Sequence, residues 1–323
     1  MARTVLLYSG PWSDLPLEEF AARAAEWGYQ GLELDCKGDH FEIQRALSET
    51  EYCQKKNDLL TRHDLTAPVL CAGTVGQAVG DIIGPRHQQL VPDYVWDDGE
   101  PEGVAQRAVE ELIAAVRAAQ ALGAATLSTP TGSPLWFCVA LQTDHATLRS
   151  GFETFMEKWN PILDACQECG VKLAAFIQAG QIAFDLYSAE MLLDVAGREE
   201  FGFAFDPSVF HWQGIDPVEF LRRFPDRIYH VYINDAALNL NGRSGLLGSY
   251  LPHGDPRRGW DYRSPGHGGV DWEAFIRGLN EIGYDGPVSV RWNDPGMDRD
   301  FGAEDACRFV KRLDFPPASR EFH

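Results

Sequence analysis

FETFMEKWNPILDACQECGVKLAAFIQ, residues 152–178, contains the two patterns that decide the fold. Its first part repeats apolar residues at helical spacing, and its last part is a short apolar run of the length expected for a buried strand. Gly170 separates the two parts and suits the left-handed conformation that ends many helices. The stretch therefore predicts a helix that stops at a glycine and leads into a strand over Lys172–Ile177.

The same unit recurs along the whole chain. Two more amphipathic stretches end at glycines, Gly123 and Gly283, and each leads into an apolar run. Helices that alternate with short apolar strands are typical of βα units on a parallel sheet. Eight such units without an intervening linker predict an α/β fold, a single (β/α)8 TIM barrel over residues 1–323. The expected strands are Thr4–Tyr8, Gly31–Asp35, Ala67–Cys71, Ala125–Ser128, Lys172–Ile177, Gly202–Asp206, Ile228–Ile233 and Pro287–Trp292.

Two connections are longer than the others. Residues 72–101 follow the third strand, and residues 234–270 follow the seventh. Both leave the carboxyl ends of strands, where barrel enzymes build their sites. We expect these two loops to form the walls of a pocket.

Composition and charge narrow the class of protein. The chain is 45% hydrophobic and 24% charged, with a formal net charge of -20 and no apolar run long enough to span a bilayer. That charge repels nucleic acid and anionic membranes, so neither is an expected partner. The N-terminal MARTVLLYSGPW lacks the apolar core of a signal peptide, which predicts a cytoplasmic protein. Seven cysteines, with a CxxC at Cys166–Cys169 inside a helical pattern, predict reduced core thiols.

Side chains on the inner face of the barrel follow from strand parity. On the second strand, the parity that turns Leu32 and Leu34 toward the helices turns Glu33, Asp35 and the following Lys37 toward the axis. The same argument on the other strands gives further inward positions. They are Phe176 and Gln178 on the fifth strand, Asp206 on the sixth, His230, Tyr232 and Asn234 on the seventh, and Ser289, Arg291 and Asn293 on the eighth.

The eighth strand, in GPVSVRWNDPG at residues 286–296, places a guanidinium inside the barrel. A buried charge without a partner costs several kcal/mol. We expect Arg291 to pair with Asp206, since even-numbered strands contribute to one layer of a barrel interior. A purely structural ion pair is the alternative. A second cation nearby, Lys37, favours a site for an anion or a developing negative charge.

Several segments resemble one known family. They are GLELDCKGDHFE, VGQAVGD, PTGSPLW, EKWNPILDAC, IAFDLYSAE, FAFDPSVFHWQGIDPVEF, RIYHVYINDA, DPRRGWDYRSPGHGGVDW and EIGYDGPVSVRWND. Together they resemble the sugar phosphate isomerase/epimerase family of xylose isomerase-like barrels over nearly the whole chain. The resemblance implies a divalent-metal enzyme that shifts a proton next to a carbonyl, through an enediol or enolate, and it is compatible with a homodimer.

The metal site of that family is degenerate here. The family's glutamate on the fifth strand falls on Phe176, its histidine after the sixth strand on Val209, and its glutamate on the eighth strand on Arg291. The resemblance leaves Asp206 as the surviving ligand, and a histidine after the third strand falls on Gly73. A guanidinium about 4 Å from a dication would be repelled by several kcal/mol. We therefore expect no metal cofactor, with Arg291 in the place of the cation.

The resulting hypothesis is a metal-independent isomerase, epimerase, lyase or cyclase that acts on a small carbonyl-bearing metabolite, in a biosynthetic setting by analogy. Two alternatives stay open: a catalytically silent binding barrel, and a metal enzyme that uses Asp206 with Glu33, Asp35 or His211. The expected catalytic residues are Arg291, Lys37, Tyr232, Asp206 and His211. The expected substrate-binding residues are Glu33, Asp35, Trp136, Phe176, Gln178, Asn234, Arg257, His267 and Asn293.

Some of these residues also have a less specific interpretation. Asp206 precedes Pro207 and could form a turn. Tyr232 could fill the core with its hydroxyl bound to a neighbour. Lys37 could extend into solvent at the rim. The arginines near Arg257 could lie in a solvated loop, and the turn at Pro207 leaves the direction of His211 open.

Overall fold

Eight parallel strands close into a barrel in the computed structural model, which describes residues 3–136, 144–248 and 251–317. Their order around the barrel is β1-β10-β7-β6-β5-β4-β3-β2, so the first strand pairs with the last. The predicted (β/α)8 fold is confirmed, and every expected strand overlaps a barrel strand. The bounds are β1 Val5–Tyr8, β2 Gly31–Asp35, β3 Thr66–Cys71, β4 Thr126–Thr129, β5 Lys172–Phe176, β6 Phe201–Phe205, β7 Ile228–Ile233 and β10 Val288–Val290.

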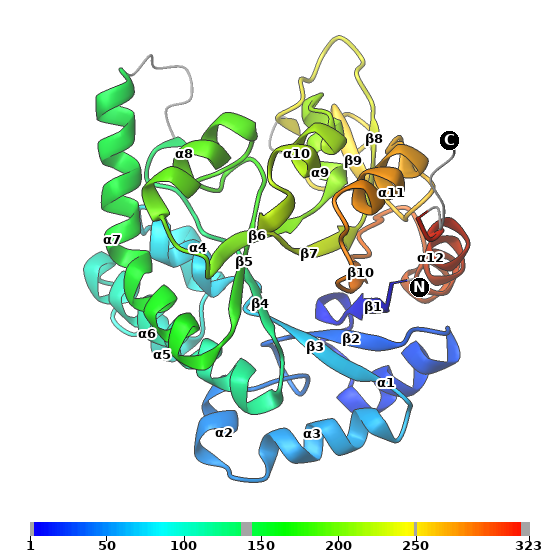
Figure 1. Ribbon diagram of the computed structural model, residues 1–323, viewed down its shortest axis with the longest axis horizontal. Helices are drawn as coiled ribbons and strands as arrows, with labels where there is room; N and C mark the ends of the chain where they lie inside the picture. The colour runs from blue at the N-terminus through cyan, green and yellow to red at the C-terminus, as the bar shows by residue number, and fades with distance from the viewer. Residues whose placement is uncertain (1–2, 137–143, 249–250, 318–323) are drawn as a thin grey trace, which may run out of the picture.

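The helices surround the strands (Figure 1). Gly123 ends α6 and Gly170 ends α7, both with positive φ, and Gly283 with φ +68° follows α11, as the sequence predicts. The longer helices are α1 Leu17–Glu26, α3 Tyr52–Thr61, α6 Pro101–Leu122, α7 His145–Cys169, α8 Leu186–Ala196, α11 Trp272–Glu281 and α12 Arg299–Leu313. The shorter ones are α2 Ile43–Ser48, α4 Val75–Gly80, α5 Asp93–Trp96, α9 Pro207–Gln213 and α10 Pro217–Arg223.

Strand alternation divides the apolar residues into two groups. The larger group, which includes Leu32 and Leu34, fills the layer between strands and helices. The smaller group lies inside the barrel and consists of Cys71, Ala174, Phe176, Ala204 and Tyr232. The inward parity predicted for β5, β6 and β7 is thus seen in the packing. Burial of each large apolar side chain contributes about 1.5–3 kcal/mol, so the pattern fixes the register strongly.

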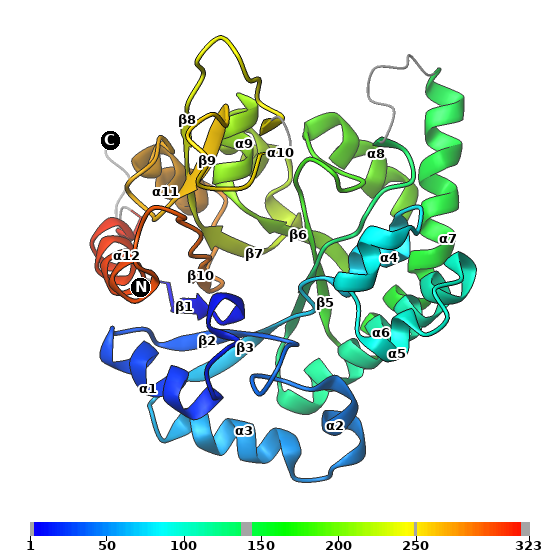
Figure 2. The ribbon, with the colours of Figure 1, turned by 180° about the vertical axis from the view of Figure 1, so that it is seen from behind.

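Both long connections contain secondary structure that the sequence analysis did not predict. The segment 72–101 holds α4, a 3-10 helix at Pro85–Gln89 and α5. The segment 234–270 holds two antiparallel strands, β8 Asp235–Leu238 and β9 Trp260–Arg263, which lie beside α9 (Figure 2). Apolar anchors explain these structures, since Val75, Val79, Val95 and Trp260 are all buried.

Two further expectations concern the cysteines, which were expected to be reduced, and the lack of a membrane-spanning segment. The cysteines at 36, 53, 71, 166, 169 and 307 are free, and Cys166 and Cys169 lie on α7 as expected. Cys138 lies outside the described residues. Within residues 3–136, 144–248 and 251–317, no helix is long and apolar enough to cross a membrane.

Candidate active site

Arg291 lies at the carboxyl end of β10, inside a cage of three aromatic rings. Its guanidinium carbon is 4.5 Å from the centroid of Phe176, 5.0 Å from that of Tyr232 and 5.5 Å from that of Tyr8. Such cation–π contacts stabilise a partly desolvated cation by about 1–2 kcal/mol. Burial opposes the charge, but nearby acidic groups, Tyr232 first among them, raise the pKa of Arg291 further, so it remains cationic.

The expected ion pair between Arg291 and Asp206 does not form, and that prediction is wrong. Asp206 is buried and caps α9: its Oδ1 accepts from the Ser208 amide at 2.9 Å and the Ser208 hydroxyl at 2.6 Å. Its Oδ2 accepts from Asn234 Nδ2 at 3.1 Å. Burial raises the pKa of Asp206, and Ser208 and the nearby charge of Arg291 oppose that rise. Asp206 therefore has the turn-forming role that the sequence left as the alternative.

Glu33 occupies the centre of the barrel, with no exposed surface. Its Oε1 accepts from Tyr232 at 2.7 Å and from Ser128 at 2.7 Å, and its Oε2 lies 3.1 Å from His230 Nε2. Burial alone would raise the pKa of Glu33, but His230 and these hydrogen bonds outweigh it and lower the pKa to about 2. Tyr232 thus donates its proton to the hydrogen bond with Glu33 and is not free to be a proton donor, while Glu33 is too deep to bind substrate.

Asp35, two residues further along β2, has a different environment. It is 7% exposed, and no cation pairs with it among the residues seen in the structure. Burial, together with the charge of Glu33, raises the pKa of Asp35 to about 6, although the Tyr8 hydroxyl, Lys37 and Arg291 oppose the rise. Carboxyl groups with pKa values near neutrality are suited to acid–base catalysis.

Arg291 borders a cavity of about 230 Å³ at the carboxyl ends of the strands. Phe176 and Gln178, both predicted as binding residues, border it too. The rest of the lining comes from loops: Gly73, Thr74, Gln77, Asp81, Arg86 and Leu90 after β3, Pro130 after β4, and Gln181 after β5. Of the two loops expected to form the pocket walls, 72–101 contributes to this lining, whereas none of the described residues of 234–270 does.

Two polar clusters hold these loops in shape. Asp81 is buried and accepts from Arg86 at 2.7 Å and the Ser133 amide at 2.8 Å, and it lies 3.0 Å from His87 Nε2. Gln181 accepts from the Thr131 amide at 2.6 Å. These residues, with Tyr8 and Ser128, are site components that sequence reasoning missed. For Asp81 and Gln181, only a place in the loops after strands could have indicated them, whereas the inward parity of β1 and β4 could have indicated Tyr8 and Ser128.

Several predicted site residues lie away from this cavity. Lys37 is exposed at the rim, as its alternative interpretation held, and is not enclosed in a dry pocket beside Arg291. Trp136 packs against Phe152 of α7 and against Phe184, and it donates to the Ile182 carbonyl at 2.7 Å. Arg257 is exposed and pairs with Asp255, and His267 is exposed beside Asp305 at 3.0 Å. Asn234 is buried beneath Asp206, and Asn293 is half-buried in the loop after β10, outside the lining.

His211 points out of the barrel. The helical turn of α9 after Asp206 rotates it toward the loop before α11, where a Cβ on Gly269 would lie 2.5 Å from its Nε2. It lines a separate cavity with Asp216 and Arg222. Neither proton transfer at Arg291 nor a metal ligand set with Asp206 can use it.

A divalent metal does not fit the residues at the strand ends. Where the resembling family has carboxylates, this chain has the ring of Phe176 and the guanidinium of Arg291 stacked over it. Val209 is buried in α9 and offers no lone pair, and both oxygens of Asp206 already accept hydrogen bonds. Across the part of the chain described, no group of three His, Cys, Asp or Glu side chains could hold a metal ion.

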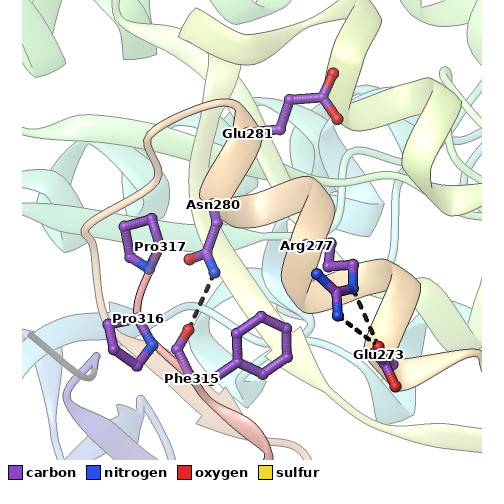
Figure 3. Close-up of a pocket in the computed structure, with 7 residues that line it drawn as sticks. All are labelled: Glu273, Arg277, Asn280, Glu281, Phe315, Pro316 and Pro317. Carbon is purple, nitrogen blue, oxygen red and sulfur yellow. Dashed lines mark hydrogen bonds and ion pairs between the residues drawn. The ribbon is translucent and has the colours of Figure 1, made fainter. Parts of the chain in front are cut away.

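A larger cavity, of about 690 Å³, lies elsewhere, between α11 and the segment that follows α12 (Figure 3). Arg277 pairs there with Glu273 at 2.7 Å, and Asn280 donates to the Phe315 carbonyl at 3.0 Å. It contains no residue from inside the barrel. Its polar groups already have partners, since Glu281 pairs with Arg222 outside the cavity, so it has no feature of a catalytic site.

The fold is a (β/α)8 barrel with a cavity beside Arg291 at the carboxyl ends of its strands. The profile of the family described as xylose isomerase-like TIM barrel matches residues 21–313. The chain belongs to that family.

Individual relatives are more distant. The uncharacterized protein YfiH of Bacillus subtilis is 27% identical over 160 residues, 48% of this chain and 50% of that protein. An inosose dehydratase of Geobacillus kaustophilus is 25% identical over 175 residues, 51% of this chain and 53% of that protein. The chain thus spans about half the length of the curated relatives it matches. The 3-keto-D-glucoside 4-epimerase YcjR of E. coli has the same fold, with a TM-score of 0.67 at 13% identity, over 96% of this chain and 99% of that one.

Proposed function

We propose that this protein is an enzyme that moves a proton at a carbon next to a carbonyl and uses the Arg291 guanidinium in place of a divalent metal. One observation supports this most directly: a half-buried cation, held by three aromatic rings and without a carboxylate partner in the described chain, borders a cavity at the carboxyl end of the barrel. A structural arginine would normally be paired. An unpaired one retains N–H donors for a ligand oxygen.

The substrate class follows from the cavity and the relatives. At about 230 Å³ the cavity is small even for ligand pockets, which suits a compact metabolite. The relatives are named for an inosose and a 3-keto-D-glucoside, and both compounds are polyhydroxylated cyclic ketones. Gln178 supplies an amide group suited to hydroxyls. We therefore propose a small cyclic polyhydroxy ketone as the substrate.

The chemical step is the transfer of a proton from carbon to a base. When the C–H bond breaks, its electron pair moves into the carbonyl and leaves negative charge on oxygen. The fixed guanidinium of Arg291 donates to that oxygen, and the rings of Phe176, Tyr232 and Tyr8 hold it in a poorly solvated position. A preorganised donor of this type accelerates a reaction by about 10²–10³-fold. Return of the proton to either face gives epimerisation or isomerisation, and loss of a neighbouring hydroxyl as water gives dehydration.

Deuterium exchange tests the proposal whichever product the enzyme forms. The protein would be treated with EDTA and incubated in D2O with a panel of cyclic polyhydroxy ketones that includes an inosose and a 3-keto-D-glucoside. Proton NMR should show loss of the signal next to the carbonyl. Exchange that requires added Mn²⁺, Co²⁺ or Zn²⁺ would contradict the role of Arg291. No exchange under any condition would favour a silent binding barrel.

The Arg291→Met variant sharpens this test. It keeps most of the packing volume and removes the charge, so we expect exchange to fall about 10²–10³-fold, the size typical for loss of one oxyanion donor. Arg45→Met is the matched control. Arg45 also stacks on a ring, that of Tyr52 at 4.9 Å, but lies on an exposed helix, and its loss should leave exchange unchanged. Equal rates in the two variants would refute an oxyanion role.

A further inference from the structure

We propose that Asp35, reached from the cavity through the missing side chain of Gly73, is the group that takes the proton from the substrate carbon. This inference rests on the proposed function and names the catalytic base, which neither the family match nor the relatives identify. Three features of Asp35 support it: its few hydrogen-bond partners, the glycine between it and the cavity, and the charges that surround it.

Asp35 is the inner carboxyl group that is not already saturated with hydrogen bonds. Glu33 has three side-chain contacts on its two oxygens and no exposure. Asp206 is held by Ser208 and Asn234. Asp81 borders the cavity, but Arg86, His87 and the Ser133 amide surround it. None of these three can accept a proton from carbon without losing its present partners.

Gly73 connects Asp35 with the cavity. It lines the cavity beside Arg291, and a Cβ built on it would lie 2.7 Å from Asp35 Oδ1 and 3.1 Å from the Tyr8 hydroxyl oxygen. The carboxyl and the phenol therefore converge on the point that a side chain would occupy. The φ of Gly73 is outside the left-handed region, so the backbone does not require glycine here. What requires it is the space in front of Asp35.

The charges around Asp35 suit a base that works near neutral pH. Tyr8 faces it from β1, Cys71 from β3 and Arg291 from β10, while Glu33 and Lys37 come from its own strand and the following turn. Burial raises the pKa of Asp35 to about 6, against the effect of Tyr8. Arg291 on the far side of the substrate oxygen would complete the pair of groups that enolisation needs: a base for the proton and a cation for the oxyanion.

In the proposed step, the substrate C–H bond breaks and an O–H bond forms on Asp35. The electron pair moves into the carbonyl, whose oxygen becomes negative beside Arg291. The proton on Asp35 then returns to carbon or leaves with a departing hydroxyl as water. The step needs no oxidant, reductant or second substrate.

The test compares three variants in the deuterium-exchange assay, with an inosose and a 3-keto-D-glucoside as probes. Asp35→Asn keeps the shape and should lower exchange at least 100-fold, within the range known for loss of a general base. Gly73→Ala places a methyl group against Oδ1 and should lower exchange at least tenfold. Gly84→Ala is the matched control: it lies in the same loop with nothing within 4 Å of its Cβ, and should stay within twofold of the wild type.

A pH profile separates catalysis from positioning. The wild-type rate should rise with pH through a midpoint near 6, because only the ionised carboxylate accepts a proton, and the residual rate of Asp35→Asn should lack that midpoint. Wild-type exchange with unchanged rates in Asp35→Asn and Gly73→Ala would overturn this inference and leave the proposed function standing. Absence of exchange in the wild type would overturn both.

Discussion

Glu33 and Asp35 lie two residues apart on β2 and face the same barrel interior, yet their acidities move in opposite directions. The pKa of Glu33 is lowered to about 2, and that of Asp35 is raised to about 6. Glu33 is surrounded by donors, His230, Ser128 and Tyr232, whereas Asp35 has the Tyr8 hydroxyl and the space left by Gly73. Strand β2 thus carries a structural carboxylate, Glu33, in the middle of the barrel and a reactive one, Asp35, at its carboxyl end.

The difference shows that the depth of a carboxyl group in the barrel decides whether it stabilises the fold or is available to a substrate. Toward the middle, polar groups can pair with one another, and Glu33 closes a network between β2, β4 and β7. At the carboxyl ends, the strands diverge into loops and leave groups with fewer partners. Pairs of titratable groups whose environments separate their pKa values commonly divide such roles.

The largest expected effect is on stability, from Glu33→Gln. Its folded pKa of about 2 lies below the usual value of 4.5, so the ionised group stabilises the fold above pH 4.5, and that stability is lost as pH falls toward 2. We expect the variant to lose about 2–4 kcal/mol at pH 7, as buried charged hydrogen bonds do. Urea unfolding at pH 7 and at pH 3 measures it, and the deficit should shrink at pH 3.

Glu111→Gln is the control for that variant. Glu111 is also buried and accepts from Tyr94 and Gln44, but burial raises its pKa and no cation pairs with it among the residues described. Glutamine can still accept from Tyr94, so the loss at pH 7 should be under about 1 kcal/mol. Equal losses in the two variants would mean that the network around Glu33 contributes nothing beyond ordinary burial.

The fold and the direction of the strand side chains could be predicted from the sequence, because both follow from the periodicity of apolar residues. Eight apolar runs gave the strands, three glycines gave helix ends, and parity placed Phe176 and Arg291 inside the barrel. Strand parity predicts which face of the sheet a side chain lies on, but it does not predict which residue that side chain binds. Arg291 and Asp206 do share the interior, but Asp206 binds the amide two residues ahead of it, a local contact that competes with any distant one.

Residues beyond the strand ends could not be placed in this way. His211 follows Asp206 by five residues, and a short helix rather than an extended strand carries it away from the axis. Trp136, Arg257 and His267 lie in loops, where no period relates sequence to direction. The role of Gly73 could not be predicted for a related reason. The absence of a side chain matters only because of the atoms that surround the glycine, and the sequence does not show which atoms these are.

A smaller effect, of opposite sign, is expected for Asp35→Asn. The folded pKa of about 6 exceeds the usual 3.8, so the native protein binds the proton more tightly and stability falls as pH rises between these values. Removal of the charge should stabilise the protein by about 1–3 kcal/mol at pH 8 and have little effect below pH 4. Thermal unfolding across this range measures it. A variant less stable than the wild type at pH 8 would show that Asp35 is a structural residue.

The smallest effect should come from Tyr8→Phe, which tests what limits the acidity of Asp35. The Tyr8 hydroxyl lowers the pKa of Asp35, so its removal should raise that pKa above 6 by about half a unit to one unit. Carbon NMR of aspartate-labelled protein follows the titration, with the Asp35 signal assigned by its absence in Asp35→Asn. Tyr29→Phe is the control, because Tyr29 is buried and donates to the Ala303 carbonyl. An unchanged or lowered midpoint in Tyr8→Phe would mean that the Tyr8 hydroxyl does not lower the pKa of Asp35. The contrast with Glu33 would then depend only on the donors around Glu33.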